Sequence, residues 1–177
     1  MNLNPTGTLP ARRDALRFLG WFAAIVTVYY GLTVIPWVDR HLMYPVLEFT
    51  AAGASKLLNL FGCPTTLKGV VIQGSDYAVA VRRGCDPLEP IMLFCAAIVA
   101  FPSVWRPKLW GMTVGGTFLY SLNLARIVSL YLLGRRQSAW FYSLHQEWWP
   151  ALYIVSAILV WLVWLRWQQT TGRQQYD

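Results

Sequence analysis

Long apolar runs, each bounded by charged or turn-forming residues, divide most of the chain. The runs cover residues 18–38, 87–105, 109–133 and 148–167, and none contains more than one charged residue. About 20 apolar residues in an α-helix cross the ~30 Å hydrocarbon core of a bilayer, because each residue adds 1.5 Å. The pattern therefore predicts an all-α membrane protein with about four transmembrane helices.

Two segments between the first and second runs have a different pattern. Residues 41–62 suit a helix, but Glu48 and Lys56 interrupt the apolar positions, which favours an amphipathic helix in the membrane interface. A bundle could also satisfy these two charges in its interior, so a further span stays open. In residues 65–83 the apolar residues flank a Gly-Ser-Asp turn, which predicts a small β-hairpin outside the bilayer.

Polar ends frame one membrane-embedded domain, which we place at residues 16–168. Residues 1–15 predict a mobile cytoplasmic tail, since they are polar and hold two prolines and a glycine. Residues 169–177 form a second polar tail. The first apolar run is longer than the core of a signal peptide and lacks a convincing cleavage site, so we expect it to be retained as an anchor.

Composition excludes several other classes of protein. Hydrophobic residues make up 56% of the 177 residues and charged residues 13%, about half the ~25% of soluble domains, which excludes a soluble or a disordered chain. The net charge of +7 comes mostly from Arg and Lys at the ends of the runs, so it indicates contacts with membrane lipids and no nucleic-acid site. Three cysteines and two histidines without metal-ligand spacing predict no metal site, and nothing indicates a cofactor.

The expected topology brings three segments to one face of the membrane. Four spans with an interfacial second segment place the start of the 87–105 run, the end of the 109–133 run and the loop 134–147 on the same side. Apart from Arg126, the basic residues divide equally, seven to each side. The triple-arginine cluster before the first span nevertheless favours a cytoplasmic amino terminus, so the shared face points away from the cytoplasm.

Cys85 is the candidate nucleophile. It follows Gly84, which permits an unusual backbone turn, and it lies at or just before the predicted start of a helix. The positive end of the helix dipole and the neighbouring Arg82 and Arg83 would favour its thiolate, the form that attacks carbonyl groups. A small apolar residue at a helix cap is the simpler interpretation of the same position. Cys95, inside an apolar run, is expected to serve in packing.

Arg126 and His145 are the candidate partners of this thiol. Arg126 lies seven residues before the end of its span, where a buried charge is costly without a partner, so we expect a functional group suited to stabilise an oxyanion. Snorkelling to the lipid headgroups is the alternative for Arg126. His145, in the loop before the last span, is the candidate general base and ranks ahead of His41, although a histidine beside tryptophans is often an interface residue.

Four further polar residues accompany these candidates. Asn123 lies one turn before Arg126 and shares its helical face. Asp86 and Glu89 would stabilise the amino terminus of the helix that follows Cys85. With Arg83, these residues are the supporting or substrate-binding candidates.

Together the three segments resemble the exosortase/archaeosortase family of membrane cysteine transpeptidases. Members carry a cysteine near a helix start, an arginine with a preceding asparagine in a later helix, and a downstream histidine. Here these are Arg-Gly-Cys85-Asp, Asn123-Leu-Ala-Arg126 and His145. The run at 82–90 is most similar to the exosortase H subgroup, although many exosortases have Cys-Ser-Gly or Cys-Ala-Gly where this chain has Cys-Asp-Pro.

The resemblance implies a bacterial inner-membrane enzyme whose site faces the outside. Its substrates would be exported proteins that end in a sorting motif, a hydrophobic span and a basic cluster, with a tail of the Ile-Pro-Thr-Leu type for the H subgroup. By the same resemblance, Cys85 would form a thioacyl intermediate, Arg126 would bind the oxyanion or assist proton delivery, and His145 would move protons. An unidentified acceptor nucleophile would then release the product.

Two other functions stay open on the sequence alone. A hydrolytic membrane cysteine protease would use the same residues with water as the acceptor. A non-enzymatic scaffold subunit of an export or exopolysaccharide system would use Cys85 structurally and Arg126 in a contact between subunits.

Overall fold

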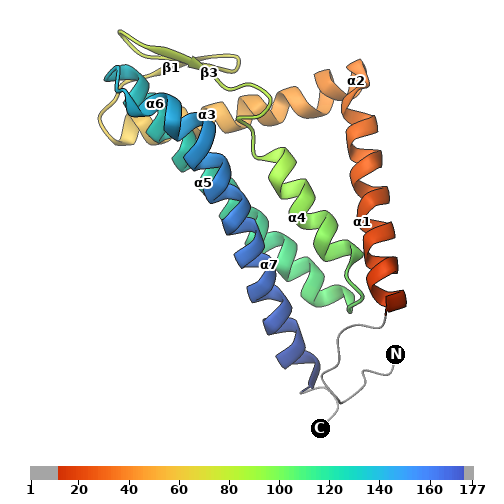
Figure 1. Cartoon of the computed structure of the whole chain (residues 1–177). Helices are drawn as coiled ribbons and strands as arrows, with labels where there is room; N and C mark the ends of the chain where they lie inside the picture. The colour runs from red at the N-terminus through yellow and green to blue at the C-terminus, as the bar shows by residue number, and fades with distance from the viewer. Residues whose placement is uncertain (1–11, 174–177) are drawn as a thin grey trace.

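Four helices running alongside one another form the body of the molecule (Figure 1). The structure is a computed structural model that describes the backbone of residues 12–173 and the side chains of residues 12–168. The four helices are α1 (Arg12–Thr33), α4 (Leu88–Ala100), α5 (Trp105–Arg135) and α7 (Trp149–Arg173). Helix α4 packs against α1 and α5, and α5 packs against α7.

Short elements cover one end of these four helices, at the top of Figure 1. They are α2 (Pro36–Val38), the π-helical segment η1 (Asp39–Met43), α3 (Tyr44–Leu60), α6 (Trp140–Ser143) and the π-helical segment η2 (Leu144–Trp148). Helix α3 lies across the ends of the other helices, which is the placement expected of an interfacial helix at 41–62. The start of α1, the α4–α5 turn and the end of α7 lie at the opposite end.

A small antiparallel sheet lies at the same end as α3. Its strands are β1 (Thr66–Lys68), β2 (Val71–Gln73) and β3 (Ala78–Ala80), in that order. The pairing of Ile72 with Val79 is that of the predicted hairpin, which is therefore confirmed. The sequence pattern missed the additional strand β1. Gly69, with φ at +59°, turns the chain between β1 and β2 so that the two strands pair.

Two apolar clusters meet along α5. The upper one joins α3, the sheet and the end of α5, and its fully buried members include Leu58 and Ile72. The lower one joins α4, the middle of α5 and α7 through Phe94, Leu119 and other residues. Asn123 and Arg126 lie between these clusters along α5, so they form a polar layer within an otherwise apolar interior.

The outer surface is that of a membrane protein, which confirms the predicted fold class. Within the described residues three helices are long and apolar enough to cross a bilayer, namely Arg12–Thr33, Trp105–Arg135 and Trp140–Gln168. None of the residues of α1 is buried by other parts of the chain. The expected span at 87–105 is a shorter apolar helix, α4, because Pro102 follows directly after its last turn and the chain is extended at Phe101.

The helix ends differ from the expected tails. Helix α1 already begins at Arg12, so the last part of the expected 1–15 tail is helical, and residues 1–11 lie outside the described residues. Helix α7 continues to Arg173, beyond the expected start of the polar tail at 169, and residues 174–177 lie outside the described residues.

Close packing between α4, α5 and α7 depends on small residues of α5. A Cβ atom at Gly115 would overlap the ring of Phe94, whereas one at Gly116 would have its nearest neighbour, Cγ2 of Ile91, at 3.8 Å. We expect Gly115→Ala to lower the free energy of unfolding by about 1–3 kcal/mol, the usual cost of overpacking. Unfolding in mixed detergent micelles, followed by helical circular dichroism, measures this difference. Gly116→Ala is the matched control, and equal stability of the two variants would contradict the packing shown here.

Candidate active site

Cys85 lies in a tight loop between β3 and α4. The loop reverses at Gly84, where φ is +84°, and the backbone N–H of Cys85 donates to the carbonyl oxygen of Arg82 at 2.9 Å. The Asp86 carboxylate accepts one N–H from Gly84 at 3.1 Å and another from Leu88 at 2.9 Å. Asp86, rather than the thiol, therefore occupies the amino terminus of α4, and of the two expected positions for Cys85 the structure has the one just before the helix.

The three catalytic candidates share one small cavity of about 50 Å³. Cys85 enters it from the loop, Arg126 from α5 and His145 from η2, and the rest of the lining is mostly apolar. These side chains are widely separated in the sequence, so the convergence predicted from the order of the spans is confirmed. A cavity of this size holds a carbonyl group or a few water molecules.

Arg126 connects α5 to the loop of Cys85. The side chain is 8% exposed, and its Nη1 atom donates to the carbonyl oxygen of Gly84 at 3.3 Å. Its Nε atom is buried without a hydrogen-bond partner among the described residues. Arg126 therefore does not snorkel to the lipid headgroups, since its guanidinium points into the protein.

The electrostatic environment of Cys85 differs from the one expected. Burial raises the pKa of the Cys85 thiol above its usual value, the Arg126 cation lowers it, and the Asp86 carboxylate raises it. The expectation that Arg83 activates the thiol is wrong, because its guanidinium forms an ion pair with Asp39 and donates to the carbonyl oxygen of Thr33 at 3.1 Å. The thiol is thus held in its neutral form, and the cation that favours the thiolate comes from α5.

His145 lies in a π-helical segment, a rare backbone form that is frequent at functional sites. Its ring stacks on Phe141 at a centroid distance of 5.9 Å, and its Nδ1 atom is buried without a hydrogen-bond partner among the described residues. The competing His41 stacks on Trp37 at a centroid distance of 4.9 Å and forms a hydrogen bond with its carbonyl oxygen, and it does not line the cavity of Cys85. Of the two histidines, His145 is thus the one that shares the cavity with Cys85.

Two buried polar side chains lie near the site within the membrane-embedded helices. Asn123 is fully buried, and neither polar atom of its amide has a hydrogen-bond partner among the described residues. Tyr153 of α7 donates its hydroxyl hydrogen to the carbonyl oxygen of Leu119 and interacts electrostatically with Arg126 and with Asp86. Sequence reasoning missed Tyr153, because one tyrosine in an aromatic-rich span carries no distinguishing pattern.

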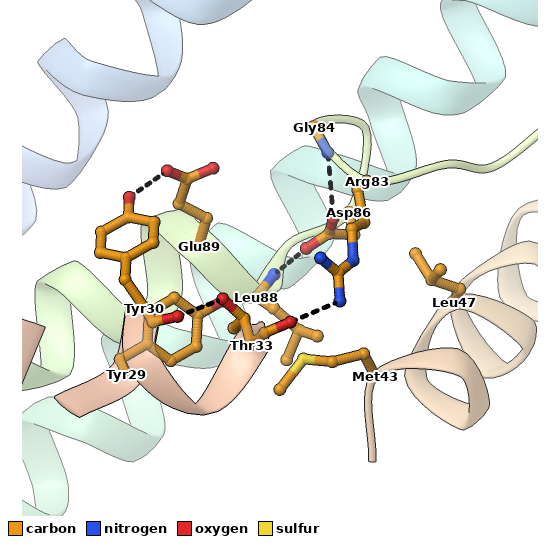
Figure 2. A pocket seen from close by; sticks show the side chains of 10 residues that line it. All are labelled: Tyr29, Tyr30, Thr33, Met43, Leu47, Arg83, Gly84, Asp86, Leu88 and Glu89. Atoms are coloured by element: carbon orange, nitrogen blue, oxygen red, sulfur yellow. Dashed lines mark hydrogen bonds between the residues drawn. The ribbon is translucent and has the colours of Figure 1, made fainter. Parts of the chain in front are cut away.

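The remaining candidates lie around a second, larger cavity. Arg83, Asp86 and Glu89 line this cavity of about 230 Å³, where Glu89 accepts a hydrogen bond from the Tyr30 hydroxyl (Figure 2). Arg83 and Glu89 therefore do not join the group of Cys85, Arg126 and His145.

The other two cysteines lie apart from both cavities. Cys95 packs against the lower apolar cluster, as expected, and Cys63 lies 3.9 Å from Nη1 of Arg135. All three cysteines are free thiols. No group of three metal-ligating side chains occurs among the described residues.

Comparison of the sequence with models of known protein families identifies its family. The model of the transmembrane exosortase family (Exosortase_EpsH) matches residues 13–149, more than three quarters of the chain. The chain belongs to the exosortase family. The matched region contains Cys85, Arg126 and His145 and ends at the start of α7. No curated protein and no solved structure matches this exosortase family member.

The charge of Arg126 should control the reactivity of Cys85. Because the cation stabilises the thiolate, Arg126→Gln is expected to raise the pKa of Cys85 further and to slow its alkylation at any pH below that value. Alkylation rates against pH, in detergent and in a background with Cys63 and Cys95 replaced by Ala, measure the effect. The control is Arg82→Gln, which removes an exposed charge from the same loop. Identical pH profiles for the two variants would contradict the assignment.

Proposed function

We propose that this exosortase family member is a membrane cysteine transpeptidase. It would cleave the carboxyl-terminal sorting tail of exported proteins through a thioacyl intermediate on Cys85 and transfer the acyl group to an acceptor nucleophile. The observation that carries the proposal is the shared cavity of Cys85, Arg126 and His145, three side chains from three separate elements. A thiol, a base and a buried cation in contact with one small space form the set that acyl transfer needs.

The chemistry follows from the protonation states. Burial keeps the Cys85 thiol protonated, so attack requires a base, and neutral His145 accepts the thiol proton as sulfur bonds to the peptide carbonyl carbon. Arg126 stabilises the thiolate and then the oxyanion of the tetrahedral intermediate. His145 returns the proton to the departing amine, which leaves a thioester on Cys85. The acceptor then gives its proton to His145 and attacks the thioester carbonyl carbon. The C–S bond breaks, and His145 passes the proton to the departing sulfur, which restores the Cys85 thiol and neutral His145.

The same proposal includes the substrates of the enzyme and its location in the cell. The substrates are exported proteins with a tripartite tail, of the Ile-Pro-Thr-Leu type, in the bacterial inner membrane. The site faces the periplasm, which is supported by the triple-arginine cluster at the end of α1 remote from Cys85. Membrane lipids cover the face of α1 that does not pack against α4, since none of the residues of α1 is buried within the chain.

Hydrolysis is the second candidate function. The cavity of about 50 Å³ has room for water beside Cys85 and His145, and water in that position would make the enzyme a protease. The mass of the released amino-terminal product separates the two, because transfer adds the acceptor and hydrolysis adds only water. A non-enzymatic scaffold would produce neither.

Loss of the thiol should abolish processing. We expect Cys85→Ala to leave the sorting tail uncleaved with the protein still in the membrane, because no other cysteine lines the cavity. Arg126→Ala should lower the rate by a factor of ~10² to 10³, the usual cost of one lost oxyanion donor. Intact-mass analysis of a tailed substrate, expressed together with each variant, measures the product. Cys95→Ala is the control and should process normally, whereas processing by Cys85→Ala would overturn the mechanism.

The sidedness is tested with thiol reagents in intact cells. A membrane-impermeant maleimide should label a variant that keeps only Cys63, because Cys63 lies beside the sheet at the end remote from the α4–α5 turn. A variant that instead carries its single cysteine at Ser103, in the α4–α5 turn, should react only after permeabilisation. The reverse pattern would place the site in the cytoplasm.

A further inference from the structure

The residues on either side of Cys85 line a second cavity. Gly84 and Asp86 contribute to the space of about 230 Å³ in Figure 2, whereas Cys85 itself contributes to the smaller cavity of His145. The larger cavity lies between α1, η1 with the start of α3, and the start of α4. One loop of the chain therefore borders both spaces.

The smaller cavity has no room for the side chains of a peptide substrate. At about 50 Å³ it accommodates the carbonyl group under attack, but no side chain next to that group. The larger cavity is several times as big and adjoins the same loop. It is smaller than the ~300–1,000 Å³ of small-molecule sites but large enough to admit an amino-acid side chain.

The walls of the larger cavity favour an uncharged side chain. Met43, Leu88 and the ring of Tyr29 supply apolar surface. The charged groups of the lining already have partners: Arg83 pairs with Asp39 and Glu89 accepts the hydroxyl of Tyr30. A charged ligand group would have to displace these partners, whereas an aliphatic side chain would not.

The Asp86 carboxylate is also occupied, because it accepts the N–H groups of Gly84 and Leu88. Gly84 leaves the backbone of the loop accessible. A Cβ atom at this position would meet no other atom within 4 Å, so the main chain of a ligand can approach the loop there. A peptide that presents its carbonyl to Cys85 can thus place a neighbouring side chain in the larger cavity.

We propose that the larger cavity is the specificity pocket of the enzyme, which binds one uncharged aliphatic side chain of the sorting motif next to the bond that Cys85 attacks. The inference rests on the proposed function, since it assigns a place to part of the same peptide. Met43 closes one wall of the pocket and is therefore a specificity-determining residue.

A size exchange between enzyme and substrate tests the pocket. An alanine and a tryptophan scan of the sorting motif, read by intact mass with the wild-type enzyme, first identifies the position where Trp blocks cleavage and Ala does not. Met43→Trp fills the pocket and should lower processing of the natural motif at least tenfold. It should process the motif with Ala at the identified position at nearly the wild-type rate, and alkylation of Cys85 should be unchanged.

The opposite variant keeps the test independent of folding defects. Met43→Ala enlarges the pocket and should cleave the motif that carries Trp, which the wild-type enzyme rejects. Leu42→Trp is the matched control for Met43→Trp, because Leu42 precedes Met43, is 54% exposed and lies outside the lining. It should process every motif as the wild type does.

The outcomes separate the two proposals. Normal cleavage by the wild type, combined with equal rates for Met43→Trp and Leu42→Trp or with rejection of the Trp motif by Met43→Ala, overturns the pocket and leaves the transpeptidase proposal intact. Absence of cleavage by the wild type overturns the proposed function, and the pocket with it.

Discussion

A buried guanidinium in a membrane-embedded helix is the constraint on which the site depends. A charge in this position costs several kcal/mol unless its surroundings compensate it. Arg126 donates one hydrogen bond, to the neutral carbonyl oxygen of Gly84, and its Nε atom has no partner among the described residues. Such a group interacts more strongly with a negative charge that forms nearby than with the groups already around it. Its position beside Cys85 therefore favours the thiolate and, in the proposed mechanism, the oxyanion that follows.

The same hydrogen bond lies between the two apolar clusters of the structure. Along α5, Leu119 belongs to the cluster with α4 and α7, whereas Ile127 belongs to the cluster with α3 and the sheet. Arg126 and Asn123 lie between these clusters, at the level of the loop that carries Cys85. The polar layer thus coincides with the boundary between the two apolar clusters, and the cavity of Cys85 adjoins the upper one through Val81 and Ile127.

The sequence was sufficient for the fold class and for the convergence of Cys85, Arg126 and His145, because both follow from the number and order of the apolar runs, although the run at 87–105 forms a shorter helix than expected. An odd number of crossings between two segments puts them on opposite faces and an even number on the same face, whatever the details of packing. The local environment of Cys85 was not predictable in this way. Arg83 is close to Cys85 in sequence, but the turn at Gly84 directs it towards Asp39, and the cation that acts on Cys85 is 41 residues away. Tyr153 and strand β1 were not predicted for a related reason, since their contacts depend on packing that no periodic pattern encodes.

The loop from Arg83 to Asp86 lines both cavities with only four residues. Gly84, with φ at +84°, donates its N–H to the Asp86 carboxylate and accepts a hydrogen bond from Arg126 at its carbonyl oxygen. Its two backbone groups therefore bind residues that line different cavities. The side chain of Cys85 then lines one space and its neighbours line the other. Any L-residue at position 84 would be strained in this conformation even though there is room for a Cβ atom. The glycine is therefore required by the backbone that orients the thiol, rather than by the space around it.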